Sequence, residues 1–224
     1  GYGKTTKVYP PFTPMEADGK TVRTVLRTHE ANDAGLWSQV EAAAQNTGIV
    51  RSILAAPMRY AVKVDGKDVP VEAGGLTFDT VADHEVKGRA GFTAGPLEAA
   101  ADLTWEYDGM MRVDLTLQPT DGAAVESLDL LIPLRHAAAT HIHAMGDGIR
   151  NTVSLRLPEK KKGRLWDATQ VERGDLPPGF CSYIYVGTPA RGLCWFAAND
   201  RGWSWERGTP NLDIVRTKEG TVLR

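Results

Sequence analysis

Residues 97–118 have the sequence LEAAADLTWEYDGMMRVDLTLQ, in which two alternating apolar and polar runs flank Tyr107-Asp108-Gly109. Alternation with a period of two is typical of strands that bury one face, and Asp-Gly between such runs indicates a hairpin. A two-residue Asp-Gly loop would place Trp105 opposite Arg112 and mix the faces. A three-residue loop with Gly109 in the left-handed conformation keeps apolar residues opposite one another. We therefore predict a bulged hairpin that pairs Trp105 with Met111, Leu103 with Val113 and Ala101 with Leu115.

The same kind of pattern continues along most of the chain. From residue 21 onward, short apolar or β-branched runs alternate with Gly, Pro and Asp-Gly turns, as in an antiparallel meander. The predicted strands are residues 22–29, 59–64, 75–80, 84–92, 97–106, 110–118, 125–133, 139–144, 181–186 and 192–197. Residues 212–224 are predicted to form a further hairpin.

The N-terminal residues differ from the rest in their proline content. Three prolines lie between residues 10 and 14, and they fix the backbone and remove hydrogen-bond donors. We predict an extended linker over residues 1–20 and one β-sandwich domain over residues 21–224 that continues into further protein. Only residues 36–45 favour a helix by local propensity, because Leu36, Trp37 and Val40 would share one helical face.

Composition excludes several classes of partner. The 224 residues include 26 Lys and Arg against 28 Asp and Glu, and these charges are scattered. A nucleic-acid-binding or membrane-binding surface needs clustered positive charge, so neither partner is expected. No apolar run reaches the ~18 to 20 residues that span a bilayer. Phosphate-binding, dinucleotide-binding and nucleophile-elbow motifs are missing as well, so no cofactor is expected.

Two cysteines and two histidines are the remaining reactive side chains of interest. The predicted hairpin places Cys194 opposite Ile184 or Tyr185, on the order of 10 Å from Cys181, so we predict free thiols. His141 and His143 share one face of a strand, and with Asp147 they are weak candidates for a divalent metal site. A third strong ligand at motif spacing is missing, so we favour histidines that form hydrogen bonds at a strand end and predict no metal.

Tryptophans gather near the C-terminal end of the sequence. Flat rings beside polar groups can stack on the C–H face of a sugar while the polar groups bind its hydroxyls. The alternative is packing, with Trp195 in the core by its alternation with Leu193 and Trp203 over the end of a sheet. The candidate carbohydrate-binding residues are Trp166, Trp195, Asp200, Arg201, Trp203 and Trp205.

Eight motifs occur in order at residues 9–14, 35–39, 54–59, 106–117, 132–135, 143–148, 163–167 and 191–203. Together they resemble bacterial glycoside hydrolase family 123-like proteins of mostly unknown function, and the last motif is the most specific. The resemblance spans nearly the whole chain. It implies a β-sandwich placed before a catalytic (β/α) barrel in exported proteins that act on glycans.

The resemblance also bears on catalysis and on local structure. The catalytic acidic pair of such proteins belongs to the barrel, and this chain has no adjacent Asp-Glu pair, so we assign no catalytic residue. An extended conformation is implied for residues 35–44. We favour it over the helix because propensity is a weak prior.

These observations lead to one fold and three functional hypotheses. We predict an all-β, large antiparallel two-sheet sandwich, with the mutarotase-like supersandwich as its large variant. The favoured function is a non-catalytic accessory domain that supports the barrel, with adjacent domains of the same polypeptide and glycan as partners. The first alternative is an autonomous carbohydrate-binding module, which requires Trp203 or Trp205 to be exposed. The second is a sugar epimerase or lyase that uses His141, His143 or Arg112.

Overall fold

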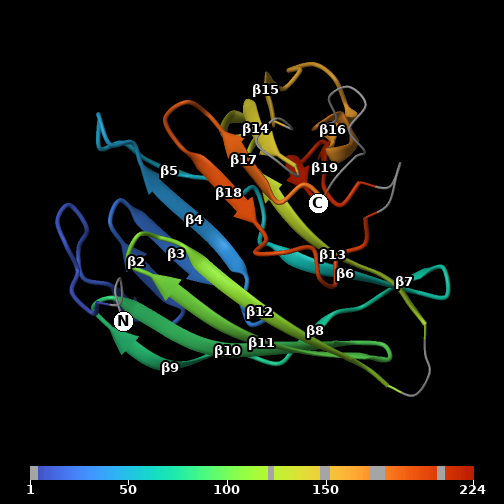
Figure 1. Cartoon of the computed structure of the whole chain (residues 1–224), viewed down its shortest axis with the longest axis horizontal. Helices are drawn as coiled ribbons and strands as arrows, with labels where there is room; N and C mark the ends of the chain where they lie inside the picture. The colour runs from blue at the N-terminus through green and yellow to red at the C-terminus, as the bar shows by residue number, and fades with distance from the viewer. Residues whose placement is uncertain (1–4, 121–123, 147–151, 172–179, 206–209) are drawn as a thin grey trace. The chain divides into compact units, whose positions relative to one another are not determined.

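The computed structural model describes residues 5–120, 124–146, 152–171, 180–205 and 210–224 (Figure 1). These residues form β-strands and two 3-10 turns, η1 (His136–Ala138) and η2 (Ala168–Val171). Contacts divide the chain into a first unit, residues 1–52 and 57–131, and a second unit, residues 53–56 and 132–224. The part of the chain that the structure describes contains no helix long and apolar enough to cross a membrane.

The first unit begins with a five-stranded antiparallel meander, drawn in blue in Figure 1. Its strands follow in chain order: β1 (Glu16–Asp18), β2 (Thr21–Thr24), β3 (Arg27–Ala31), β4 (Trp37–Ala43) and β5 (Val50–Ser52). Glu16 pairs with Arg23, so this sheet starts inside the segment predicted as a linker.

A tight turn divides the segment that we predicted as one strand over residues 22–29. Thr24 pairs with Arg27 across the turn, and Leu26 within it has a φ of 60°. The prediction of one continuous strand is wrong. Tight turns usually contain Gly, Pro, Asn or Asp, and neither Val25 nor Leu26 is such a residue.

Residues 37–43 are extended in β4. This strand pairs with β3 on one side and β5 on the other. Pairing on both sides overrides local helix propensity, which is worth only a fraction of a kcal/mol per residue. The extended conformation that we favoured is confirmed.

The second sheet of the first unit contains the predicted bulged hairpin. Its strands are β8 (Glu72–Ala73), β9 (Thr77–Ala82), β10 (Glu85–Ala94), β11 (Leu97–Glu106) and β12 (Met111–Pro119). Trp105 pairs with Met111, Leu103 with Val113 and Ala101 with Leu115, and Gly109 has a φ of 91°. The predicted register and turn are therefore confirmed.

These two sheets enclose one apolar core. Its buried members are Met15, Val22, Ala31, Val86, Ala101, Leu103 and Trp105. Phe78 meets the buried ring of Trp105 edge to face, with the ring centroids 5.6 Å apart. A third set of strands in this unit comprises β6 (Arg59–Val64), β7 (Lys67–Val69) and the first part of β13 (Val125–Leu134).

The second unit contains two further antiparallel sheets. In one, β16 (Gly163–Asp167), β19 (Asp213–Arg216), β20 (Thr221–Leu223) and the end of β13 lie in this order. In the other, the order is β15 (Thr152–Arg156), β14 (His141–Met145), β17 (Tyr183–Gly187) and β18 (Gly192–Phe196). Val215 pairs with Val222, which confirms the predicted C-terminal hairpin.

The cysteines occupy the positions that the hairpin predicted. Cys194 pairs with Tyr185, and both thiols are free, with Cys181 buried and Cys194 exposed. Every strand pairing recorded among the described residues is antiparallel, and the prediction of an all-β antiparallel sandwich is confirmed. That residues 21–224 form a single domain stays a prediction.

Candidate functional site

Strand β18 positions the first candidate tryptophan. Leu193 is buried, and Trp195 lies two residues later on the same side of the strand, half-buried. Its strand partner is the fully buried Ile184. Trp195 therefore belongs to the inner face of the sheet, the face that also carries the buried Leu193 and Ile184.

Trp203 lies in the loop that follows β18 and packs against Trp195. The two rings meet edge to face, with centroids 5.0 Å apart and planes inclined by 81°. The buried ring of Phe180 has its centroid 6.1 Å from that of Trp203 and 6.4 Å from that of Trp205. We call Phe180, Trp195, Trp203 and Trp205 the aromatic cluster. Sequence reasoning missed Phe180, which lies far from the other three along the chain.

A turn in the loop fixes the position of Trp203. The Trp203 amide donates a hydrogen bond to the Asp200 carbonyl at 3.1 Å, and the Arg201 amide donates to the Asn199 side-chain oxygen at 3.0 Å. The side chains of Asp200 and Arg201 are exposed, and Trp203 keeps 40% of its surface open to solvent. An aromatic ring, an acid and a guanidinium thus share one exposed loop.

Trp166 differs from these residues in its burial. It is fully buried in β16, and its indole N–H has no hydrogen-bond partner among the described residues. A ring without exposed surface offers no face for stacking on a ligand. In this structure Trp166 packs the interior of the second unit.

The outer face of the sheet formed by β15, β14, β17 and β18 carries polar and aromatic side chains. The side chains on the opposite face of the same strands, such as those of Ile142, Ala144 and Ile184, are buried. Three rows in register cross the four strands: Arg156, His141, Gly187 and Gly192; Ser154, His143, Tyr185 and Cys194; and Thr152, Met145, Tyr183 and Phe196. We call this surface the outer face. The predicted placement of His141 and His143 on one strand face is confirmed.

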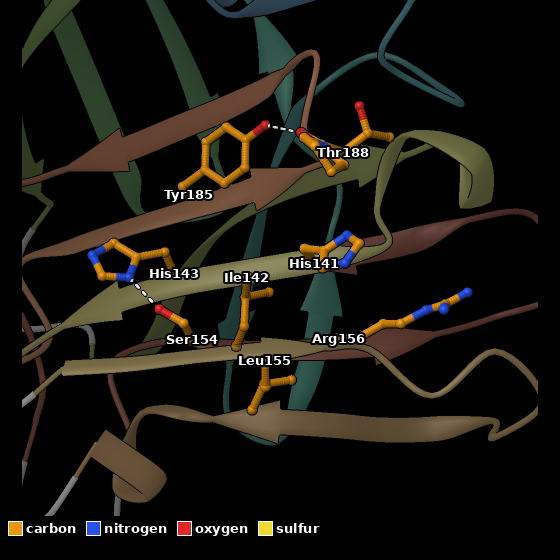
Figure 2. A pocket seen from close by; sticks show the side chains of 9 residues that line it. His141, Ile142, His143, Ser154, Leu155, Arg156, Tyr185 and Thr188 are labelled. Atoms are coloured by element: carbon orange, nitrogen blue, oxygen red, sulfur yellow. Dashed lines mark hydrogen bonds between the residues drawn. The ribbon is translucent and has the colours of Figure 1, made fainter.

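A hollow of about 460 Å³, which we call the β14 hollow, lies on this outer face (Figure 2). It is lined by His141, His143, Ser154, Arg156, Tyr185, Thr188 and Pro189, together with Ile142 and Leu155, which alternate with the outer-face residues along β14 and β15. All of these residues belong to the second unit. Apart from the histidines, none was a candidate from sequence, because Tyr185 and Arg156 become neighbours of β14 only through strand pairing.

Glycines make room for the Tyr185 ring. A Cβ placed on Gly192 would lie 2.6 Å from Cζ of Tyr185, so the ring occupies space that a side chain would otherwise fill. The Tyr185 hydroxyl donates a hydrogen bond to the Thr188 carbonyl. The hydrogen bond to Thr188, drawn in Figure 2, and the close approach to the glycines fix the ring along one side of the hollow.

Neighbouring hydroxyl groups hold both histidines. Nδ1 of His143 lies 2.7 Å from Oγ of Ser154, and Nδ1 of His141 lies 2.8 Å from Oγ1 of Thr140. Figure 2 shows the two imidazoles directed to opposite ends of the strand. Among the described residues, no three His, Cys, Asp or Glu side chains gather as metal ligands, and Asp147 lies outside the described residues.

Both tyrosines of β17 have a raised pKa. The hydrogen bond with the Cys194 thiol at 3.2 Å, followed by burial, raises the pKa of Tyr183 to about 12. Burial is also the main cause that raises the pKa of Tyr185. Both phenols are protonated at neutral pH, with the Tyr185 hydroxyl donating to the Thr188 carbonyl and the Tyr183 hydroxyl bonded to the Cys194 thiol.

Arg112, the arginine of the epimerase or lyase alternative, belongs to the first unit. Its guanidinium forms an exposed ion pair with Asp114 at 2.8 Å on the same strand. This contact, with a further contribution from Glu106, raises its pKa. The pair follows from alternation along β12, which places Arg112 and Asp114 on one face of the strand.

Comparison with known families gives a match over most of the chain. Residues 15–171 match the family model described as glycoside hydrolase 123, third domain. No curated protein matches the chain. The matched region includes the whole meander, the bulged hairpin and β14 to β16.

Proposed function

Because the chain belongs to the glycoside hydrolase 123 third-domain family, we propose that it is a non-catalytic accessory domain that supports a catalytic barrel and contacts glycan. Its partners are then the adjacent domains of the same polypeptide and a glycan bound between or beside them. Export from the cytoplasm is part of this proposal, since the resemblance implies proteins that act on glycans outside it.

The observation that carries the glycan contact is the exposure of Trp203 within the aromatic cluster. Edge-to-face contact with Trp195 holds the Trp203 ring, while 40% of the residue remains open to solvent. A held aromatic ring binds a sugar with little loss of side-chain entropy, and Asp200 and Arg201 on the same loop can bind its hydroxyls. The remainder of the cluster supports this one ring.

The same exposure favours one second candidate, an autonomous carbohydrate-binding module. That module would bind glycan without the barrel, whereas an accessory domain contributes part of a larger site. Glycan hydrolysis is assigned to the barrel in both cases, because the resemblance places the acidic pair there. No comparable observation favours the epimerase or lyase hypothesis: Nδ1 of His141 and Nδ1 of His143 each lie within hydrogen-bond distance of a neighbouring hydroxyl, and Arg112 is ion-paired.

A glycan-array screen of the chain, with Trp203→Ala and Phe196→Ala beside it, tests the proposal. Phe196 is the matched control, because it is also an exposed aromatic residue, at 51%, but lies outside the aromatic cluster. We expect binding that is reduced about tenfold or more in folded Trp203→Ala and kept in Phe196→Ala. Unchanged binding by Trp203→Ala, or a folded chain that retains no glycan, would contradict the glycan contact.

A further inference from the structure

We propose that the β14 hollow binds a saccharide that carries a carboxylate or sulfate group. This inference goes beyond the proposed function, because the hollow lies on the outer face of the sheet, opposite the face that holds Trp195. It needs no residue of the aromatic cluster. Binding at the hollow and binding at Trp203 can therefore be tested separately.

The first argument is the fixed aromatic wall. Tyr185 lies over the space left by Gly187 and Gly192, and its hydroxyl is bonded to the Thr188 carbonyl. Such a ring presents a flat apolar surface that is already ordered before a ligand arrives. Sugars bind to surfaces of this kind through their C–H groups.

The second argument is the charge at one end of the hollow. Three segments meet there, because His141 pairs with both Arg156 and Gly187, and Gly187 pairs with Gly192. Residues 135–140, 156–162 and 187–192 contain one carboxylate, Glu159, and six basic side chains: Arg135, Arg156, Lys160, Lys161, Lys162 and Arg191. Arg156 lines the hollow itself, and the other five basic residues lie in the three segments at its end. Clustered charge of one sign raises the local concentration of the opposite ion. Neutral sugars gain nothing from this field, so the site favours acidic ones.

Arg156 is the group best suited to bind the anion directly. It lines the hollow, and its side chain is 66% exposed while paired with Glu159, which is 68% exposed. Exposed ion pairs contribute little stability, so a ligand carboxylate can replace Glu159 at low cost. The planar guanidinium then offers two parallel N–H donors to a carboxylate or sulfate.

The remaining lining residues suit the hydroxyl groups of a sugar. His143 and Ser154 form a hydrogen-bonded pair on one side of the hollow, and Thr188 borders the other side. Its volume of about 460 Å³ lies within the ~300 to 1,000 Å³ typical of small-ligand sites. The hollow thus combines an aromatic wall, hydroxyl partners and a cationic end.

Isothermal titration of the full chain with three oligosaccharides of equal length tests this proposal. One contains uronic acid, one is sulfated, and one is neutral. We expect one or both acidic ligands to bind about tenfold or more tightly than the neutral one, with affinity falling as salt rises. Equal affinity for all three, or no binding of either acidic ligand, would overturn the proposal.

Variants locate the site. Arg156→Gln should weaken acidic-ligand binding about tenfold, and Glu159→Gln should strengthen it by freeing Arg156. Arg112→Gln is the matched control, because Arg112 is also 66% exposed and ion-paired, but lies in the first unit. An equal loss of acidic-ligand affinity in Arg112→Gln, or no loss in Arg156→Gln, would overturn the assignment of the site to the β14 hollow.

Trp203→Ala should keep acidic-ligand binding, which separates this result from the test of the proposed function.

Discussion

At the scale of single residues, His29 is a buried imidazole in a setting that disfavours its charged form. It is 1% exposed in β3, and its ring stacks on Trp37 with centroids 4.8 Å apart. Burial, helped by the charge of Arg27, lowers its pKa to about 4 from 6.5. Nδ1 has no hydrogen-bond partner among the described residues, so no hydrogen bond at this nitrogen offsets the cost of charging the ring.

The lowered pKa of His29 predicts that the folded protein loses stability in acid. Between pH 6.5 and about 4, the unfolded chain binds a proton at His29 and the folded chain does not. The free energy of unfolding should therefore fall as pH falls through this window, by about 3 kcal/mol at most. Urea unfolding at successive pH values measures the slope. His29→Phe keeps a ring against Trp37 and should flatten the curve.

The matched control for this experiment is His143→Phe, at an exposed position of the second unit. It should leave the slope in place. A His29→Phe curve as steep as that of the unchanged chain would show that other groups cause the acid sensitivity.

At the scale of elements, the β11–β12 hairpin depends on a positive φ at one residue. Gly109 has a φ of 91°, and a Cβ there would also lie 2.9 Å from Cδ of Arg27. The Arg27 guanidinium in turn donates to the Asp108 carbonyl at 3.0 Å. Any other residue at position 109 would therefore meet two penalties, the strained backbone conformation and the close contact with Arg27.

Gly109→Ala should lower the free energy of unfolding by about 1 to 2 kcal/mol, as measured in urea. Gly66→Ala is the control that separates the two causes, because Gly66 has a φ of 73° with nothing within 4 Å of its Cβ position. It should cost less than Gly109→Ala. Equal losses would mean that the contact with Arg27 contributes nothing.

This hairpin also shows what a sequence can predict about the fold. Register followed from alternation on both strands and from a glycine at the only loop position that keeps the apolar faces together. The β2–β3 turn could not be predicted, because Leu26 adopts a φ of 60° without a turn residue beside it. Short edge strands such as β5 and β8 carry too few residues to show a period.

The candidate site was predictable only in part, for a related reason. Alternation placed His141 and His143 on one face of β14 and Trp195 beside Leu193 on the inner face of β18. The β14 hollow also needs Tyr185 and Arg156, which pairing between strands brings to the histidines. The burial of Trp166 and the exposure of Trp203 depend on packing that no local pattern records.

At the scale of the whole molecule, the two units are interleaved in the sequence. Residues 53–56 leave the first unit, pack within the second, and return. Ile53 and Leu54 have no exposed surface. Leu54 bridges to Leu134, and the Arg135 amide donates to the Ile53 carbonyl at 3.0 Å. The second unit is therefore incomplete without a segment that precedes it by almost eighty residues in the sequence.

Leu54→Ala tests whether this segment stabilises the second unit specifically. Removing a fully buried leucine side chain costs about 2 to 5 kcal/mol. Hydrogen exchange followed by mass spectrometry should show faster exchange in residues 132–134 and in β19 and β20, with little change in β10 and β11. Leu117→Ala is the control, because that leucine is 44% exposed on β12 and should change stability by less than about 0.5 kcal/mol. Equal acceleration in β10 and β11 would show instead that the two units open together.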